Sequence, residues 1–151
     1  GEVRTFDMYK FRSMSADADE RLADLAELNE ADGPLFKIKD DPRVTRIGKF
    51  IRKHSIDELP QFLNCLMGQL SCVGPRPPLP SEVAQYDARA MRRLSVKPGL
   101  TGYWQVSGRS DTTFDDMVDL DLAYIEERSF LVDLRVIAKT VVTMLDGKGA
   151  C

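Results

Sequence analysis

The sequence predicts a mainly helical α+β fold, a single domain with a minor β component. Residues 113–127 and 129–145 place apolar side chains at helical spacing. Residues 2–14 instead alternate apolar and polar side chains, as a strand does. The chain has 151 residues, of which 43% are hydrophobic and 30% charged, and this composition is typical of one folded domain with a core of its own.

The first third of the chain is expected to hold a strand or hairpin arm and then an acidic helix. The alternating residues 2–14 supply the strand. Ser15 can cap the helix, which the turn signal Asp32-Gly33-Pro34 ends. Residues 35–39 then form a short extended piece. The helix has a narrow apolar stripe made of Leu22, Leu25 and Leu28.

A basic helix is expected to open at Pro42, since proline fits the first helical turn. Its apolar side chains share one face, namely Val44, Ile47 and Ile51. Its charged side chains spread over the remainder: Arg43, Arg46, Lys49, Arg52 and Lys53. This pattern suits a membrane surface or a phosphate-rich site, and an ordinary solvated helix face explains it equally well.

The rest of the chain is expected to be helices joined by proline-rich and glycine-rich segments. The three prolines of residues 74–78 fix φ and remove backbone donors, so that segment cannot be regular. A glycine-containing loop covers residues 97–109. The predicted helices are residues 57–68, 80–96, 113–127 and 129–145, the last ended by Gly147.

Charge, cysteine content and hydropathy exclude several classes. The net charge of -3 provides no global basic field, so we expect no nucleic-acid partner. Cys65, Cys72 and Cys151 lack metal-ligand spacing, which argues against a disulfide framework or a zinc site and fits a reducing compartment. Cys65 and Cys72 are expected to be core thiols. No apolar run reaches the roughly 18 residues that a membrane span needs.

The adjacent carboxylates Asp57 and Glu58 are the strongest candidate for chemistry. Two ionised neighbours repel each other unless cations lie close by. Ser55 and Glu58 have the spacing of a helix capping box, and the alternative is a helix whose first residue is Pro60. Either start places the pair at a helix N-terminus, which favours anions. A purely structural role of Glu58 as a cap remains open.

Three arginines are candidates for binding phosphate. Arg52, Arg76 and Arg109 each lie beside a helix breaker or a helix end. Arg76 stands between Pro75 and Pro77, which restrict its motion in advance and suit bidentate binding of an anion. The glycines of residues 98–102 and 107–109 permit close approach of a ligand to the backbone, and plain turns are the alternative.

Two other features, the Asp119-Leu120-Asp121 pattern and His54, are weaker candidates for a catalytic site. Asp119-Leu120-Asp121 resembles a metal motif or the nucleophile of an aspartyl phosphatase, but positions i and i+2 of a helix do not share a face. Asp121 and Tyr124 do share one, so Asp121 alone can point into a site. His54, the single histidine, has no partner that would make it a catalytic base and is interpreted as a packing or helix C-terminal residue.

Several motifs in this order resemble the bacterial sugar transferase family, the monotopic polyprenyl-phosphate phosphoglycosyl transferases. The resemblance runs from about Tyr9 to the C-terminus, and the ending at residues 147–150 is similar to the hexose-1-phosphate branch. The motifs are Lys10-Phe11-Arg12-Ser13-Met14, Asp41-Pro42-Arg43-Val44-Thr45-Arg46-Ile47-Gly48, Ser55-Ile56-Asp57-Glu58-Leu59-Pro60-Gln61, Val73-Gly74-Pro75-Arg76-Pro77, Lys97-Pro98-Gly99-Leu100-Thr101-Gly102 and Gln105-Val106-Ser107-Gly108-Arg109.

The resemblance implies an activity and a set of residues. Asp57 would attack a UDP-sugar, form a covalent aspartyl phosphosugar and release UMP, after which polyprenyl (undecaprenyl) phosphate accepts the sugar phosphate. Glu58, with Asp57, would hold Mg²⁺. The implied phosphate-binding and substrate-binding residues are Arg52, Arg76, Arg109, Lys10, Arg12, Asp121 and Tyr124. Such a reaction begins exopolysaccharide, capsule or O-antigen assembly.

The resemblance also implies a place in the cell. Family members work at the cytoplasmic face of the bacterial inner membrane and carry a membrane-embedded helix-turn-helix before the Lys10 motif, which this sequence lacks. We therefore expect residues 1–151 to be an N-terminally truncated catalytic domain. It would act at the inner leaflet, and its exposed apolar face could support a homo-oligomer. The alternative is a catalytically silent domain that binds a nucleotide sugar or a partner.

Overall fold

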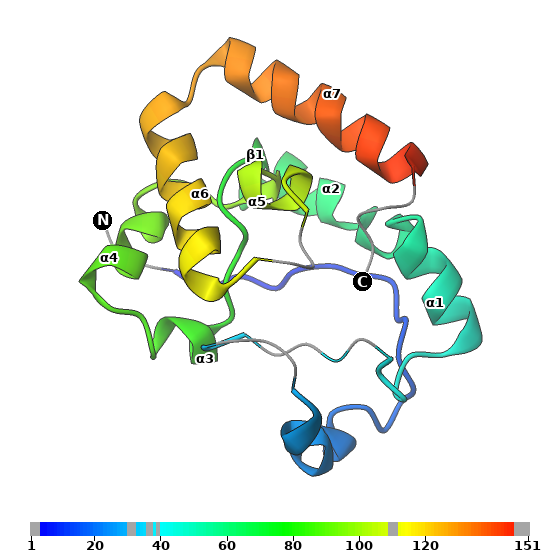
Figure 1. The fold of residues 1–151 in the computed structure, drawn as a ribbon. Coiled ribbons are helices and arrows are strands. Elements are labelled where there is room, and N and C mark those ends of the chain that lie inside the picture. Colours follow the sequence, from blue (N-terminus) through cyan, green and yellow to red (C-terminus); the bar gives the residue numbers. More distant parts are fainter. Residues whose placement is uncertain (1–3, 30–32, 36–37, 39, 109–111, 147–151) are drawn as a thin grey trace.

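The computed structural model describes residues 4–29, 33–35, 38, 40–108 and 112–146, which form a mainly helical α+β fold (Figure 1). The predicted fold class is therefore confirmed. In chain order the elements are η1 Glu20–Leu28, α1 Arg46–Lys53, η2 Ile56–Glu58, α2 Gln61–Leu66, β1 Ser71–Val73, α3 Pro80–Val83, α4 Ala88–Met91, η3 Arg92–Ser95, β2 Gly99–Thr101, α5 Tyr103–Val106, α6 Phe114–Glu127 and α7 Phe130–Asp146, where η marks a 3₁₀-helix.

The two long C-terminal helices, α6 and α7, confirm the predictions for residues 113–127 and 129–145. Thr113 begins α6 with a capping box: its hydroxyl accepts from the Asp116 N–H at 3.2 Å, and the Asp116 carboxylate accepts from the Thr113 N–H at 2.9 Å. The predicted stop at Gly147 lies outside the described residues. None of the described helices is long and apolar enough to cross a membrane.

The core is built around a small parallel sheet of β1 and β2. Ser71 is opposite Gly99 and Val73 is opposite Thr101. Val73 packs against Tyr124 of α6 and the buried Val136 of α7, so the two long helices meet at the sheet. A second cluster joins the short helix α4 to α6 through Ala90, Val118 and Leu122.

Three glycines lock the sheet to the proline-rich segment. A Cβ atom on Gly99 would lie 2.0 Å from the Gly74 nitrogen, and one on Gly102 would lie 2.2 Å from the Gly74 carbonyl oxygen. Only glycine allows backbones to approach this closely. The glycines of residues 98–102 therefore serve contact between two chain segments, which explains their presence without a ligand.

The predicted strand at residues 2–14 is wrong for the part that the structure describes. Residues 4–13 are extended but lie in no sheet, and Met14 forms only an isolated antiparallel bridge with Val44. Their backbone groups bond elsewhere: the Tyr9 N–H donates to the Asn64 side chain, and the Phe11 N–H to the Asp57 carbonyl. The segment runs across the molecule towards α1 (Figure 1).

The acidic and basic helices start later than predicted. The acidic stretch forms only the 3₁₀-helix η1, from Glu20. Helix α1 begins after Thr45, whose hydroxyl accepts from the Gly48 N–H at 2.9 Å, so Pro42 does not open it. Ile47, on the predicted apolar face, is 75% exposed, while Gly48 is buried against Ser13.

Two predicted helices are broken into shorter pieces. The segment at residues 57–68 forms η2 and α2, and residues 80–96 form α3, α4 and η3. Asp87 causes the second break because its carboxylate accepts from the Ala90 N–H at 2.7 Å and restarts the helix. The predicted loop at residues 97–109 contains β2 and α5.

Three local predictions near the dyad need correction. The capping box is absent, because Ser55 adopts a left-handed conformation with φ 52° and its side chain makes no capping hydrogen bond. Pro60 is the N-cap of α2 and not its first helical residue. Cys72 is exposed and Cys65 half-buried, so neither is a core thiol.

Candidate active site

The dyad lies where η2 turns towards α2. The Asp57 side chain is 6% exposed, and that of Glu58 is 28% exposed. Two features hold the turn: the left-handed Ser55 just before it, and the Phe11 N–H, which donates to the Asp57 carbonyl oxygen at 2.9 Å. Left-handed residues other than glycine are costly and concentrate at functional sites. The turn therefore presents one buried and one half-exposed carboxylate side by side.

Two predicted cations lie beside this dyad. The Lys10 ammonium is 3.4 Å from a Glu58 carboxylate oxygen. Arg52, near the end of α1, donates from Nε to the Ser13 hydroxyl at 3.0 Å. Arg12 is exposed on the same extended segment, between the two residues whose backbones contact η2 and α1. Lys10, Arg52, Asp57 and Glu58 thus lie together in the fold.

The surroundings of Asp57 make its charge costly. Burial raises the pKa of Asp57 above its ordinary value, and the neighbouring Glu58 raises it further. Lys10 and Arg52 oppose this and favour the ionised carboxylate. A carboxylate that is desolvated but kept near cations is suited to act as a nucleophile when a cationic group or metal ion joins it.

The donor set of the dyad fits Mg²⁺ when a phosphorylated substrate shares the ion. Magnesium prefers oxygen ligands and is commonly held by one or two carboxylates together with substrate phosphates and water. Asp57 and Glu58 provide two carboxylates, and no cluster of three or more acidic, histidine or cysteine ligands exists among the described residues.

A second group of charges surrounds Arg76 and Asp121. Arg76 makes two hydrogen bonds to Glu82, of 2.8 and 3.2 Å, and its guanidinium lies 5.9 Å from the centre of the Trp104 ring. Arg93 pairs with Asp121 at 2.7 Å, and both side chains are 1% exposed. Arg93 also donates to the Arg76 carbonyl oxygen at 3.2 Å. This buried network fixes the proline-rich segment that carries Arg76.

Asp121 is incompletely satisfied inside this network. Its Oδ2 accepts from Arg93, but its Oδ1 has no hydrogen-bond partner. Burial raises the pKa of Asp121 to about 6, although Arg93 favours the charged form. Asp119, two residues earlier on the same helix, is exposed and pairs with Arg89. The two aspartates thus occupy opposite environments on a helix, which removes the basis for the aspartyl phosphatase interpretation.

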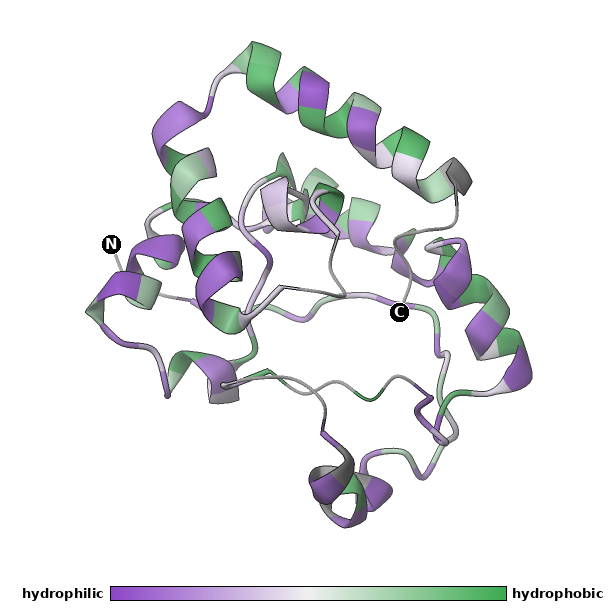
Figure 2. Ribbon diagram, in the orientation of Figure 1, coloured by the Kyte–Doolittle hydropathy of each residue, from purple (hydrophilic) through white to green (hydrophobic). Residues whose placement is uncertain are grey.

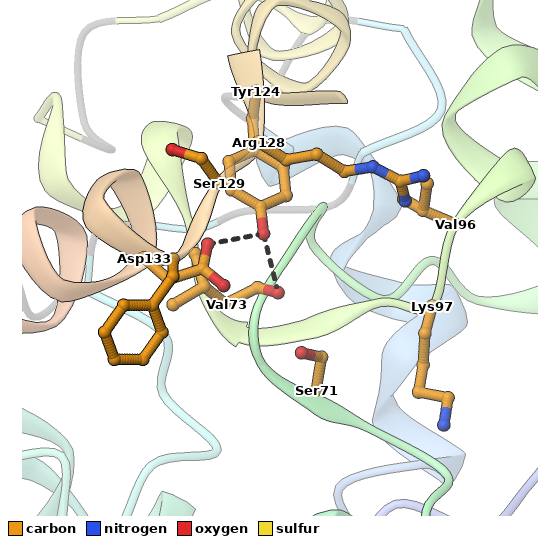
Figure 3. A pocket seen from close by; sticks show the side chains of 9 residues that line it. Ser71, Val73, Val96, Lys97, Tyr124, Arg128, Ser129 and Asp133 are labelled. Atoms are coloured by element: carbon orange, nitrogen blue, oxygen red, sulfur yellow. Dashed lines mark hydrogen bonds between the residues drawn. The ribbon is translucent and has the colours of Figure 1, made fainter. Parts of the chain in front are cut away.

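Tyr124 lines a separate cavity of about 320 Å³ (Figure 3). Its hydroxyl donates to the Asp133 carboxylate at 2.8 Å and lies 3.2 Å from the Val73 carbonyl oxygen. Burial, followed by the Asp133 hydrogen bond, raises the pKa of Tyr124. Arg128 and Lys97 line one side of the cavity (Figure 3). Tyr124 therefore joins α6, α7 and β1, a role that packing explains.

The structure places most of the predicted site residues in two groups, one around the dyad and one in the buried network. Lys10 and Arg52 lie beside the dyad, and Arg12 is exposed on the segment that carries Lys10. Arg76 and Asp121 belong to the buried network, and Tyr124 faces different partners although it follows Asp121 by one helical turn. Arg109 lies outside the described residues. His54 caps the C-terminus of α1 and packs on Phe50 with ring centres 4.7 Å apart, which confirms its predicted packing role.

Sequence reasoning missed four residues that hold these groups in place. Ser13 positions Arg52, and Asn64 binds the backbone of the segment that carries Lys10, through Tyr9 and Asp7. Glu82 and Arg93 hold the Arg76 segment. Their partners lie 6 to 57 positions away in sequence, so local spacing contained no signal for three of the four. For Glu82, the six-residue spacing from Arg76 was visible but fitted no standard helical pair.

Comparisons with known proteins identify relatives of this chain. A family model described as "Bacterial sugar transferase" matches residues 1–147. The chain is 53% identical over 148 residues to galactosyl transferase CpsE of Streptococcus agalactiae, covering 97% of the chain and 33% of that protein. It is 40% identical over 151 residues to the exopolysaccharide production protein ExoY of Sinorhizobium fredii, covering 97% and 67%.

A third relative is the undecaprenyl-phosphate galactose phosphotransferase of Salmonella typhimurium, which is 41% identical over 155 residues. The match covers 97% of this chain and 32% of that protein, so the chain spans about a third of the length of two of these relatives. The family model covers almost the whole chain, the dyad included. The chain belongs to the bacterial sugar transferase family.

Proposed function

We propose that this chain transfers a sugar 1-phosphate, most simply hexose 1-phosphate, from a UDP-sugar to polyprenyl phosphate and releases UMP. The observation that carries the proposal is the buried Asp57 carboxylate, which lies beside Glu58 and within the influence of Lys10 and Arg52. A carboxylate can accept a phosphoryl group when neighbouring cations offset the charge of the incoming diphosphate. Membership of the family supports the same reaction class.

The reaction would proceed in two displacements at the same phosphorus. An Asp57 oxygen attacks the phosphorus that carries the sugar, and the bond from that phosphorus to the bridging oxygen breaks, so that UMP departs. An oxygen of polyprenyl phosphate then attacks this phosphorus, and its bond to Asp57 breaks. The products are polyprenyl diphosphate sugar and a free Asp57 carboxylate, ready for another cycle.

The surrounding residues would provide charge and position. Arg52 is fixed by Ser13, so its guanidinium loses little additional freedom when it meets a phosphate. Lys10 is 42% exposed and can move from Glu58 to an incoming anion. Bound Mg²⁺ would withdraw charge from the diphosphate and would be held by Glu58 and Asp57. Arg12 and Arg109 are proposed as further phosphate ligands, on the sequence motif alone.

Arg76 has a more restricted part in this proposal. Its guanidinium is engaged by Glu82, and 26% of its side chain is exposed. It would therefore act as a fixed charge that shares itself between Glu82 and a phosphate, and not as a mobile clamp. Asp121 would act on substrate only through the Arg76 segment, because its side chain is fully buried. Tyr124 would support the same region through β1.

The proposed location is a membrane surface, at the inner leaflet where polyprenyl phosphate is available. Large apolar side chains are exposed along three helices, and Figure 2 shows hydrophobic segments along α7. Leu66 of α2 is 84% exposed and Phe130 of α7 is 76% exposed. Exposed large apolar side chains gathered along helices are typical of surfaces that bind a membrane or a protein. A lipid substrate favours the membrane.

The donor is proposed to be a UDP-hexose. The names of CpsE and of the Salmonella relative include galactose. UDP-galactose is therefore the donor to test first, and UDP-glucose and UDP-N-acetylgalactosamine follow, since a relative from Aeromonas hydrophila is named for N-acetylgalactosamine.

The test is intact-mass analysis of the purified chain after incubation with each UDP-sugar and Mg²⁺, with Asp57→Asn alongside. We expect a sugar-phosphate adduct on the unaltered chain, an equivalent amount of UMP, and discharge of the adduct by polyprenyl phosphate in detergent. Asp119→Asn is the matched control, because Asp119 is an exposed carboxylate outside the dyad and should leave the adduct intact. An adduct that persists in Asp57→Asn would overturn the proposed role of Asp57.

A further inference from the structure

Two cysteines lie close together on neighbouring elements, α2 and β1. Cys65 is half-buried in α2, and Cys72 is exposed in the middle of β1. The chain folds back between them because the Asn64 carbonyl oxygen accepts from the N–H groups of Gln69 and Leu70, at 2.9 and 3.2 Å. This tight reversal brings the end of α2 against the start of β1.

Strand geometry directs the Cys72 thiol away from α6 and α7, and the Cys65 thiol contacts the same strand. Successive side chains of a strand point to opposite faces. Val73 points towards α6 and α7, where it packs against Tyr124 and Val136. Cys72 therefore points to the other face. The Cys65 thiol reaches the same strand, since its Sγ lies 3.7 Å from the Ser71 carbonyl oxygen, next to Cys72 in sequence.

The two thiols also influence each other. Burial raises the pKa of the Cys65 thiol, and the charge and hydrogen bond of Cys72 raise it further. Cys65 is accordingly the less reactive thiol towards solvent reagents, because the thiolate is the reacting form. Cys72 is the more accessible of the two. This is the arrangement of an accessible thiol with a second thiol in place to react with it.

We propose that Cys65 and Cys72 form a dithiol site that a small-molecule disulfide converts reversibly into an internal disulfide. The site lies outside the dyad and its cations, and the proposed transfer reaction does not use it. In a reducing compartment the resting form is the dithiol, and the disulfide forms when the thiol pool becomes oxidised.

The exchange involves two steps. The Cys72 thiolate attacks one sulfur of the small disulfide, which forms a mixed disulfide and releases one small thiol. The Cys65 thiol then loses its proton to solvent and attacks the Cys72 sulfur, forming the internal S–S bond and releasing the second small thiol. Two electrons pass from the two cysteines to the small disulfide, so no other oxidant is needed.

The internal disulfide would tie α2 to β1. Helix α2 directly follows the dyad, and its Asn64 holds the segment that carries Lys10. Strand β1 leads into the Arg76 segment. The new bond would therefore connect the elements on which the two charged groups are mounted.

The test uses the purified chain with Cys151→Ser, so that only the two cysteines of the site remain. The chain is incubated with oxidised glutathione, quenched with acid, alkylated under denaturing conditions and analysed by intact mass and peptide mapping. We expect loss of two hydrogen atoms, no bound glutathione, no alkylation, and a linked peptide containing Cys65 and Cys72. Excess reduced glutathione, added before the quench, should return both cysteines to free thiols, so that both are then alkylated.

Single substitutions provide the matched controls. Cys65→Ser should retain glutathione on Cys72, since no second thiol can displace it, while Cys72→Ser should be modified much more slowly. Circular dichroism verifies that each variant is folded. Persistent glutathione on Cys72 of the two-cysteine chain would overturn the proposal, and so would a native chain that does not react while the urea-unfolded chain does.

Discussion

At the scale of single residues, the candidate nucleophile is a group whose charge opposes folding. Asp57 is 6% exposed and adjoins Glu58, so its ionised form is disfavoured by burial and by its neighbour. The Asp57 carboxylate is nevertheless available to a phosphoryl group, because no tight salt bridge to it has to be broken first. Activity and stability therefore make opposite demands on this side chain.

Asp57→Asn is expected to abolish transfer, with a loss of more than about 10³-fold, and to stabilise the fold at neutral pH. A raised pKa means that the Asp57 carboxyl contributes stability below the ordinary pKa of the unfolded chain, and that this contribution is lost as pH rises through the folded pKa. The denaturation midpoints of the two proteins should coincide below about pH 4 and diverge above it. Higher stability of the unaltered chain at pH 7 would contradict this.

For the buried pair of Arg93 and Asp121 we expect the reverse, namely that substitution destabilises the fold. Removing one partner leaves an uncompensated buried charge, so Arg93→Ala is expected to cost about 3–5 kcal/mol of unfolding free energy. Replacing both residues by apolar ones, as in Arg93→Met with Asp121→Leu, should recover much of that loss. Chemical denaturation of Arg93→Met, of Asp121→Leu and of the double variant measures the coupling free energy between the two side chains. Arg92→Ala is the exposed control and should change stability by less than about 0.5 kcal/mol.

At the scale of elements, the dyad depends on how α1 meets the N-terminal segment. The Thr45 N–H donates to the Ser13 carbonyl oxygen at 3.0 Å, and Arg52, near the other end of α1, reaches the Ser13 hydroxyl. Gly48 lies between them and lets the helix touch that carbonyl. One residue of an extended segment thus fixes a whole helix and the cation at its end.

Gly48→Ala is expected to separate α1 from this segment. The added Cβ would lie 1.9 Å from the Ser13 backbone oxygen, and a backbone atom cannot swing aside, so we expect a loss of at least about 1–3 kcal/mol in unfolding free energy. Transfer activity should fall with it, because Arg52 would move. Ile47→Ala, on the exposed side of the same helix, should leave the unfolding free energy nearly unchanged. Equal effects of the two substitutions would refute this account of α1.

The sequence supports prediction of the long elements and of the dyad group much better than of the connections. Residues 113–127 hold enough turns for their apolar spacing to identify α6. Ser55, by contrast, adopts a left-handed conformation just before a turn that bonds to the distant Phe11, so the capping-box spacing was misleading. Residues 4–13 alternate like a strand but bond to side chains and turns, a partner choice that only the folded chain determines.

At the scale of the whole molecule, the distribution of apolar surface is unusual for a chain of this size. The buried hydrophobic clusters are small and centred on Val73 and Val118, while eighteen large apolar side chains of the described residues are exposed. Several lie on α7, whose other side packs on β1 and α5. The molecule therefore has a thin core and one long helix that is only half covered.

Substitutions on the uncovered side of α7 are expected to weaken membrane binding without unfolding the chain. Leu134→Gln with Val141→Gln removes two half-exposed apolar side chains, which should reduce partitioning into phosphatidylglycerol-containing vesicles by about tenfold or more. Cosedimentation measures the binding, and thermal denaturation verifies the fold. Asp119→Asn on α6 is the matched control. Unchanged cosedimentation of the α7 variant would show that another surface binds the vesicles.

The backbone contact among Gly74, Gly99 and Gly102 has a consequence for mutagenesis of this region. Any side chain at these three positions would collide with backbone atoms, so most substitutions there are expected to destabilise the fold strongly. Diversity is better placed at the exposed positions that flank them, such as Leu79 and Lys97, where new side chains meet solvent or flexible neighbours. Near the proline-rich segment, the three glycine positions are therefore expected not to tolerate substitution, whereas the exposed positions around them are expected to tolerate it.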